Sequence, residues 1–181
     1  LDNISKDIQE KIQGVSEVLT ILDVPLLNSP KISFSDLSNE QRTLRDKDID
    51  LSLAKKEFES SPLYKNLLMS EDSTTTVIVV NFKKDQKYFN LLNERNRLRE
   101  INLSRELSND EKLLLKKYEI DFKDYSSFHA LEEKQNIKKI RKIINNYKSE
   151  ASMFLGGVPM ITSDMTDFIA QDVEKFGVGV F

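Results

Sequence analysis

The sequence predicts an α+β fold, and three observations lead to this class. Helix-period and strand-period segments alternate along the 181 residues, and the strand richest in β-branched residues lies at 74–82. Residues 85–150 contain neither glycine nor proline and are helical in period, which marks them as an insertion. Without the insertion the predicted order is helix, strand, strand, helix, strand, helix. We therefore expect a ferredoxin-like (βαββαβ) porter-type sheet that lacks its first strand, with a charged helical insertion.

The first predicted elements occupy residues 1–59. A helix begins the chain because four apolar residues recur on one helical face: Leu1, Ile4, Ile8 and Ile12. Gly14 ends this helix, and a strand follows over residues 15–24. Pro25 and Pro30 bracket a loop. The spacing of Leu51, Ala54 and Phe58 then predicts a short helix over residues 48–59.

The strand at 74–82 follows a turn formed by Glu71, Asp72 and Ser73. Both of its faces are apolar, with Val77 and Val79 pointing one way and Ile78, Val80 and Phe82 the other. A strand of this kind is central in a sheet or has its second face covered by a partner. We expect that partner to be a sister domain or another protomer.

The insertion is predicted to form a helical hairpin or small bundle. Its first helix carries Leu91, Leu92, Leu98 and Ile101, and Ser108 with Glu111 forms a capping box for a second helix. A third helix starts near Ser127 and places four residues on one face: Ile137, Ile140, Ile144 and Tyr147. The chain thus divides into residues 1–84 (first part of the α/β domain), 85–150 (insertion) and 151–181 (final strand and helix).

The last segment is predicted as a strand at 152–157, a turn at Pro159 and a helix. The N-cap of that helix is Thr162, Ser163 or Asp164, and the sequence does not choose among them. One face of the helix is apolar, with Met165, Phe168, Ile169, Val173 and Phe176.

Composition and motifs argue against several classes of function. A net charge of −3 is unlike that of a dedicated nucleic-acid binder, and the absence of cysteine excludes disulfides and thiolate chemistry. His129 is the single histidine, which leaves it without a partner for an ordinary zinc site or a marked serine triad. Gly156 and Gly157 lack the Gly-Lys-Ser/Thr ending of a phosphate loop. We predict no enzyme activity, no metal and no cofactor.

Two segments have a functional and a structural interpretation. Residues 46–57 place Asp46, Asp48, Asp50, Ser52 and Glu57 at the ligand spacing of a calcium loop, but Leu51 stands where the turn needs glycine. The same residues fit a helix with an acidic first turn, which we favour. Residues 134–148 form a basic amphipathic helix that fits an anionic membrane or nucleic acid, or, as we favour, a helix packed through its isoleucines with its lysines in water.

Two longer stretches carry a family resemblance. The stretch "SPLYKNLLMSEDSTTTVIVVNF", with the Ser70-Glu71-Asp72 turn, and the stretch "FLGGVPMITSDMTDFIAQDVEKFGVGVF" are similar to segments of RND-superfamily exporters. The motif positions in the second stretch are Gly157, Val158, Pro159, Asp164 and Asp172. The resemblance covers residues 60–181 well, apart from the bulk of the insertion, and residues 1–25 weakly.

The resemblance implies an extracytoplasmic domain between the first and second membrane helices of a proton-driven exporter in the bacterial inner membrane, on the periplasmic side. Such exporters move amphiphilic or lipid-like substrates, and their proton-carrying carboxylates lie in membrane helices. The implied partners are a sister extracytoplasmic domain of the same parent chain and further copies of the parent. The apolar run at 176–181 is then expected to lead into a membrane span.

Two other functions fit the same residues. The chain fits a membrane-anchored extracytoplasmic domain that senses ligands or acts as an adaptor without transport. It also fits, less well, a soluble interaction module centred on residues 85–150.

Overall fold

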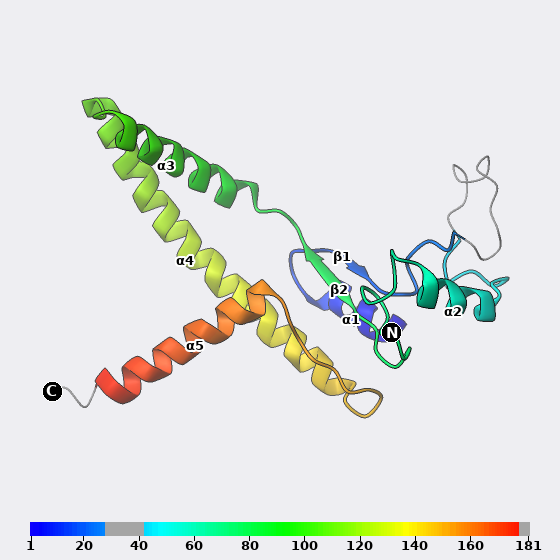
Figure 1. The fold of residues 1–181 in the computed structure, drawn as a ribbon. Helices are drawn as coiled ribbons and strands as arrows, with labels where there is room; N and C mark the ends of the chain where they lie inside the picture. Colours follow the sequence, from blue (N-terminus) through cyan, green and yellow to red (C-terminus); the bar gives the residue numbers. More distant parts are fainter. Residues whose placement is uncertain (28–41, 178–181) are drawn as a thin grey trace. The chain divides into compact units, whose positions relative to one another are not determined.

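The computed structural model describes residues 1–27 and 42–177, which form two compact units (Figure 1). The first unit runs from Leu1 to Lys83, and the second begins at Lys84. The predicted α+β class is confirmed, because the described residues form five helices and one two-stranded antiparallel sheet. Pro30 and residues 178–181 lie outside the described residues.

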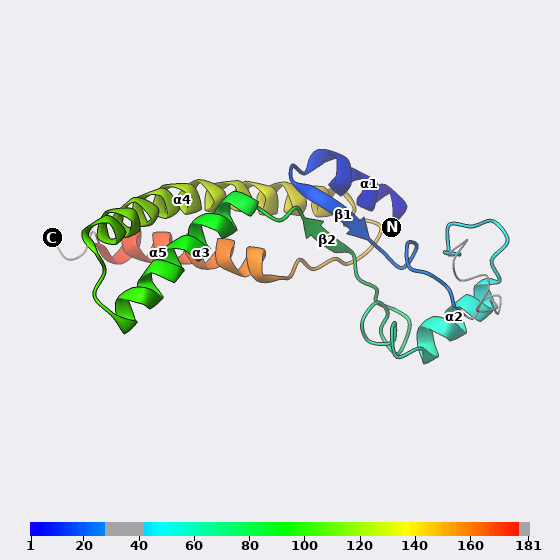
Figure 2. The same cartoon turned by 90° about the horizontal axis from the view of Figure 1, so that it is seen from above.

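The first unit contains α1 (Asp2–Lys11), β1 (Val15–Leu19), α2 (Leu51–Ser60) and β2 (Val79–Phe82). Ile4, Ile8 and Ile12 are buried, which confirms the predicted apolar face at these three positions. Leu1, predicted on the same face, is the N-cap of α1 and is 46% exposed. Gly14 adopts φ +82°, the left-handed backbone that glycine tolerates, and this turns the chain into β1. Figure 2 shows β1 and β2 side by side.

Strand β1 pairs antiparallel with β2, from Val15 opposite Phe82 to Leu19 opposite Val79, with an irregularity between Val15 and Glu17. The predicted strand over 15–24 is wrong beyond Leu19. The Asp23 carboxylate accepts the backbone N–H of Thr20 at 2.8 Å and its hydroxyl at 2.7 Å. These bonds close a turn, because an aspartate side chain that takes nearby backbone donors competes with the sheet ladder.

Strand β2 is also shorter than the predicted strand at 74–82. The Asp72 carboxylate accepts the hydroxyls of Ser70 and Thr74, and Ser73 has a φ of +57°, so this segment forms a turn. Met69 and Thr76 form an isolated bridge before β2 begins. The expectation of a central strand is wrong for the described residues, since their sheet has the order β1-β2.

The core of the first unit forms around α2. Asp50 caps this helix by accepting the N–H groups of Ser52 and Leu53. Leu51, predicted on the inner face, is 70% exposed; it is the first residue of the helix, one turn before the buried Ala54. The buried core residues are Leu26, Ala54, Phe58 and Tyr64.

The second unit contains α3 (Gln86–Ser104), α4 (Asn109–Asn146) and α5 (Val158–Gly177). Helices α3 and α4 form the predicted hairpin, visible in Figure 1, and the Ser108–Glu111 capping box is present. The predicted third helix is wrong: α4 continues through Ser127, whose hydroxyl donates to the carbonyl of Lys123 at 2.8 Å. No glycine or proline interrupts the 38 residues of α4, which therefore extend about 57 Å.

The predicted strand at 152–157 is also wrong, because these residues form neither helix nor strand. Gly157 adopts φ +110°, and its carbonyl accepts the N–H of Ile161 at 3.1 Å, so α5 begins at Val158. Pro159 lies inside the first turn of α5, where its missing N–H has no helical partner to lose. The three proposed N-cap residues are therefore interior to the helix.

Candidate interaction surface on helix α5

The least exposed residues of α5 are the polar Ser163, Asp164 and Asp167, together with the half-buried Pro159 and Met160. Ser163, on the α4 side, is 6% exposed. Arg141 of α4 donates to the Asp164 carboxylate at 2.8 Å, and Lys134 of α4 forms an ion pair with Asp167. The hydrogen bond from Arg141 lowers the pKa of Asp164 and raises the pKa of Arg141. Two ion pairs on one helix face fix the rotation of α5 about its own axis.

The opposite face of α5 is apolar and exposed. Phe168 is 64% exposed and Phe176 is 71% exposed, values that an amphipathic helix normally shows for its polar side. From Phe168 to Gly177 every residue of α5 is exposed, so the distal half of the helix leaves α4 (Figure 1). The exposed apolar row comprises Val158, Ile161, Met165, Phe168, Ile169, Val173 and Phe176.

This arrangement reverses the usual one, in which apolar residues cover the core and charged residues meet water. An exposed apolar row of this length marks a surface that contacts another molecule or a membrane. The sequence identified five residues of the row from their spacing. It did not indicate that the row faces outward, because that orientation depends on Lys134 and Arg141, which lie more than twenty residues upstream of their partners.

Basic residues continue along α4 beside the α5 contact. Four basic residues of α4 lie on one side of the helix, at successive spacings of four, three and one residues: Lys134, Lys138, Arg141 and Lys142. Lys134 and Arg141 are paired with α5. Lys138 and Lys142 are exposed and have no ion-pair partner among the described residues. We call Lys138 and Lys142 the α4 lysine row.

The first set of motif residues stabilises a turn. Ser70 accepts the N–H of Thr75 at 3.0 Å through its hydroxyl and donates to Asp72 at 2.6 Å. Glu71 pairs with Lys65 at 3.1 Å, and the hydrogen bond from Lys65 lowers the pKa of Glu71. The exposed Asp72 has a lowered pKa because Ser70 and Thr74 donate to it. These contacts give the three residues a structural role.

The second set of motif residues defines α5. Gly157 supplies the positive φ at which the helix begins, and Pro159 occupies its first turn. Asp164 pairs with α4, whereas Asp172 is exposed in the distal half. The two motif sets belong to different units, and each is explained within its own unit.

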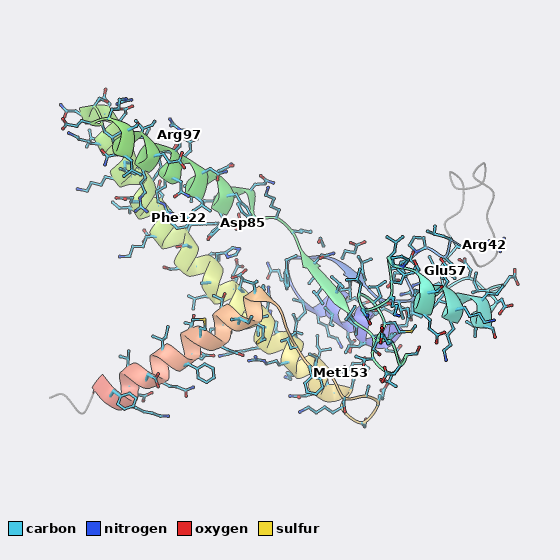
Figure 3. The ribbon with its side chains drawn as sticks, viewed as in Figure 1. Arg42, Glu57, Asp85, Arg97, Phe122 and Met153 are labelled. Carbon is cyan, nitrogen blue, oxygen red and sulfur yellow. The ribbon has the colours of Figure 1, made fainter. Side chains whose placement is uncertain are left out.

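His129 lies in the middle of α4. Its Nε2 is 3.8 Å from Asp85 and its Nδ1 is 3.8 Å from Glu133, and its ring lies 5.1 Å from that of Tyr88. Asp85, labelled in Figure 3, caps α3 by accepting the N–H of Tyr88 and also accepts the hydroxyl of Tyr125 at 2.9 Å. The two ring nitrogens face different carboxylates, so these groups do not converge on one ion.

The calcium-loop interpretation of residues 46–57 does not fit the structure. Glu57, also labelled in Figure 3, lies within α2, is 4% exposed and accepts the N–H of Leu27 at 2.6 Å. It therefore points into the core, away from Asp50 at the start of the helix. Across residues 1–27 and 42–177, no cluster of three or more histidine, cysteine, aspartate or glutamate side chains could hold a metal ion.

Comparisons with family models, with curated proteins and with solved structures find no match. Within the described part of the chain, no helix has both the length and the low charge required to cross a bilayer.

Proposed function

We propose that this chain is an extracytoplasmic porter-type domain of a proton-driven RND-type exporter of amphiphilic or lipid-like substrates. The observation that carries the proposal is the order of the two motif-bearing stretches: a Ser70-Glu71-Asp72 turn that leads to a strand, then Gly157 and Pro159 opening a long terminal helix. In such a protein the energy-coupling carboxylates lie in membrane helices, and this domain lines the substrate route.

The geometry of α5 supports the proposal. A helix that turns its apolar row away from its own domain suits a segment that contacts lipid or another part of a membrane protein. Ion pairs to α4 hold the proximal half of α5 in this orientation. The hairpin of α3 and α4 adds a long rigid element that can shift as one body when membrane helices move.

The finer fold is part of the same proposal. The order of α1, β1 and β2 fits the middle of a βαββαβ unit if α2, which lies between the two strands, is an addition to that unit. Strands β1 and β2 pair antiparallel, as the second and third strands of that unit do. We assign them to a ferredoxin-like porter sheet that further strands of the parent protein complete. Val77 and Val79, both exposed, then lie on the face that a sister domain or another protomer covers.

The test uses the full-length protein encoded by the native gene. The 181 residues contain no cysteine, so Ser104→Cys at the exposed end of α3 introduces one label site here, and any cysteine elsewhere in the full-length protein is first replaced by serine. We expect a membrane-impermeant maleimide to label this site in cells with a permeabilised outer membrane. Cells that carry the protein should also accumulate less of an amphiphilic dye, and a protonophore should abolish the difference.

The two readouts separate the candidate functions. Labelling from outside without gradient-dependent export would favour the anchored sensor or adaptor. Protection of Ser104→Cys until the inner membrane is lysed would contradict both extracytoplasmic functions.

A further inference from the structure

We propose that the apolar row of α5 and the α4 lysine row form one surface that binds an anionic phospholipid bilayer. The apolar residues enter the boundary between headgroups and acyl chains, and the lysines contact the lipid phosphates. This inference goes beyond the exporter assignment, since neither motif set nor transport requires a particular lipid charge.

The two rows adjoin each other through an ion pair. On α5, Ile161 and Phe168 lie three residues before and four residues after Asp164, so both are its neighbours on the helix surface. On α4, Lys138 lies three residues before Arg141 and is likewise its neighbour. The Arg141–Asp164 pair is itself partly exposed and joins the two helices. This pair therefore links the helix that carries the apolar row to the helix that carries the two lysines.

Charge complementarity selects an anionic partner for this surface. Residues 134–149 contain six basic and no acidic residues, and the two basic residues with ion pairs are those that neutralise Asp164 and Asp167 of α5. The chain carries a net charge of −3, but salt screens charges beyond about 10 Å at 0.1 M, so the local lysines dominate. Each lysine near an anionic leaflet strengthens binding severalfold.

The apolar row is the part of the surface that inserts into the bilayer. It includes two phenylalanines, Phe168 and Phe176, among its seven residues, and phenylalanine is typical of the apolar face of helices that lie in a membrane interface. Phe154, which is 96% exposed shortly before α5, adds a third. Asp172 and Glu174 both lie among the distal apolar residues of the row, between Ile169 and Phe176. We therefore expect the proximal part of α5 to insert most strongly.

The experiment is cosedimentation of the 181-residue protein with large vesicles of phosphatidylcholine alone or with 30% phosphatidylglycerol. We expect binding to the mixed vesicles at 0.1 M salt, weakening about tenfold or more at 0.5 M salt. The variant Lys138→Gln/Lys142→Gln should lose about tenfold or more in affinity. The variant Phe168→Ser/Val173→Ser should lose a similar factor in affinity for the mixed vesicles, and its binding should keep the same salt dependence.

Matched controls come from the same hairpin. Lys116→Gln/Lys117→Gln removes the same charge from exposed positions of α4 that lie outside the row. Leu103→Ser/Leu113→Ser removes exposed apolar residues from α3 and α4. Both control variants should bind like the original protein, and circular dichroism should show unchanged helix content in all four.

Three results would overturn the proposal. One is no difference between mixed and phosphatidylcholine vesicles, and another is equal loss in the row and control variants. The third is a protein that does not bind vesicles but forms a dimer, measured by light scattering, which Phe168→Ser/Val173→Ser abolishes. In that case α5 would bind a second copy of the chain. The dye-export measurement is separate, so failure here leaves the exporter assignment standing.

Discussion

At the scale of the residue, Arg45 joins three segments of the first unit. Its guanidinium donates to Asp23 at 2.7 Å and also pairs with Asp2 at the start of α1. Asp23 in turn holds the Thr20 turn, and Thr20 is completely buried. This network stabilises the point at which β1 ends, and none of its long-range pairs has a local signature in the sequence.

The pH dependence of stability tests this network. Hydrogen bonds from Arg45 and Lys6 lower the pKa of Asp2 to about 2, below its unfolded value of 3.8. A carboxylate with a lowered pKa contributes stability above its unfolded pKa and loses that contribution as the pH falls toward its folded pKa. The stability of Asp2→Asn, measured by urea unfolding, should therefore fall less than that of the original protein between pH 4.5 and pH 2.5.

Asp48→Asn is the control, because Asp48 is an exposed aspartate of the same unit without a contact to Arg45. The stability of Asp48→Asn should fall between pH 4.5 and pH 2.5 by as much as that of the original protein. A slope for Asp2→Asn that matches the slope of the original protein would show that Asp2 makes no such contribution.

A second prediction at this scale concerns Gly157. A residue with a Cβ is strained at φ +110°, so Gly157→Ala should destabilise the second unit by about 1–3 kcal/mol. Gly156→Ala is the matched control: a Cβ there meets no atom within 4 Å and needs no positive φ. Thermal unfolding followed by circular dichroism compares the two variants, and equal melting temperatures would contradict a conformational role for Gly157.

At the scale of the element, local signals predicted helices better than strands. The capping box at Ser108 and the apolar spacing in α1 and α3 identified those helices because the signal lies within a few residues. Strands depend on partners elsewhere, and side-chain hydrogen bonds at Asp23 and Asp72 replaced predicted strand by turn. The orientation of α5 was missed for the same reason, because Arg141 and Lys134 determine it from another helix.

The start of α4 gives a prediction at this scale. The Ser108 hydroxyl accepts the N–H of Glu111, and the Glu111 carboxylate accepts the N–H of Ser108. Ser108→Ala should cost about 1 kcal/mol of unfolding free energy, since one helix-terminal N–H loses its partner. Ser126→Ala, in the middle of α4, should be neutral or stabilising because alanine favours helix. Urea unfolding measures both variants; an equal effect would contradict the capping role.

At the scale of the whole molecule, the chain combines a small α+β unit with a helical unit whose last helix is turned outward. The lipid proposal depends on that orientation of α5, and the exporter proposal draws support from it. Were the apolar row to face α4 instead, the exposed surface would be polar, and no feature of α5 would favour a membrane or a partner.

The most direct measurement is the reactivity of single cysteines, since the chain contains none of its own. Ser163→Cys replaces a buried residue on the α4 side, and Val173→Cys replaces one that is 66% exposed on the apolar row. Rates of maleimide labelling in native buffer, each divided by the rate in denaturant, compare the two sites. We predict a rate at Val173→Cys near that of the unfolded chain and strong protection at Ser163→Cys. Protection at Val173→Cys with a free Ser163→Cys would contradict the outward orientation of the apolar row.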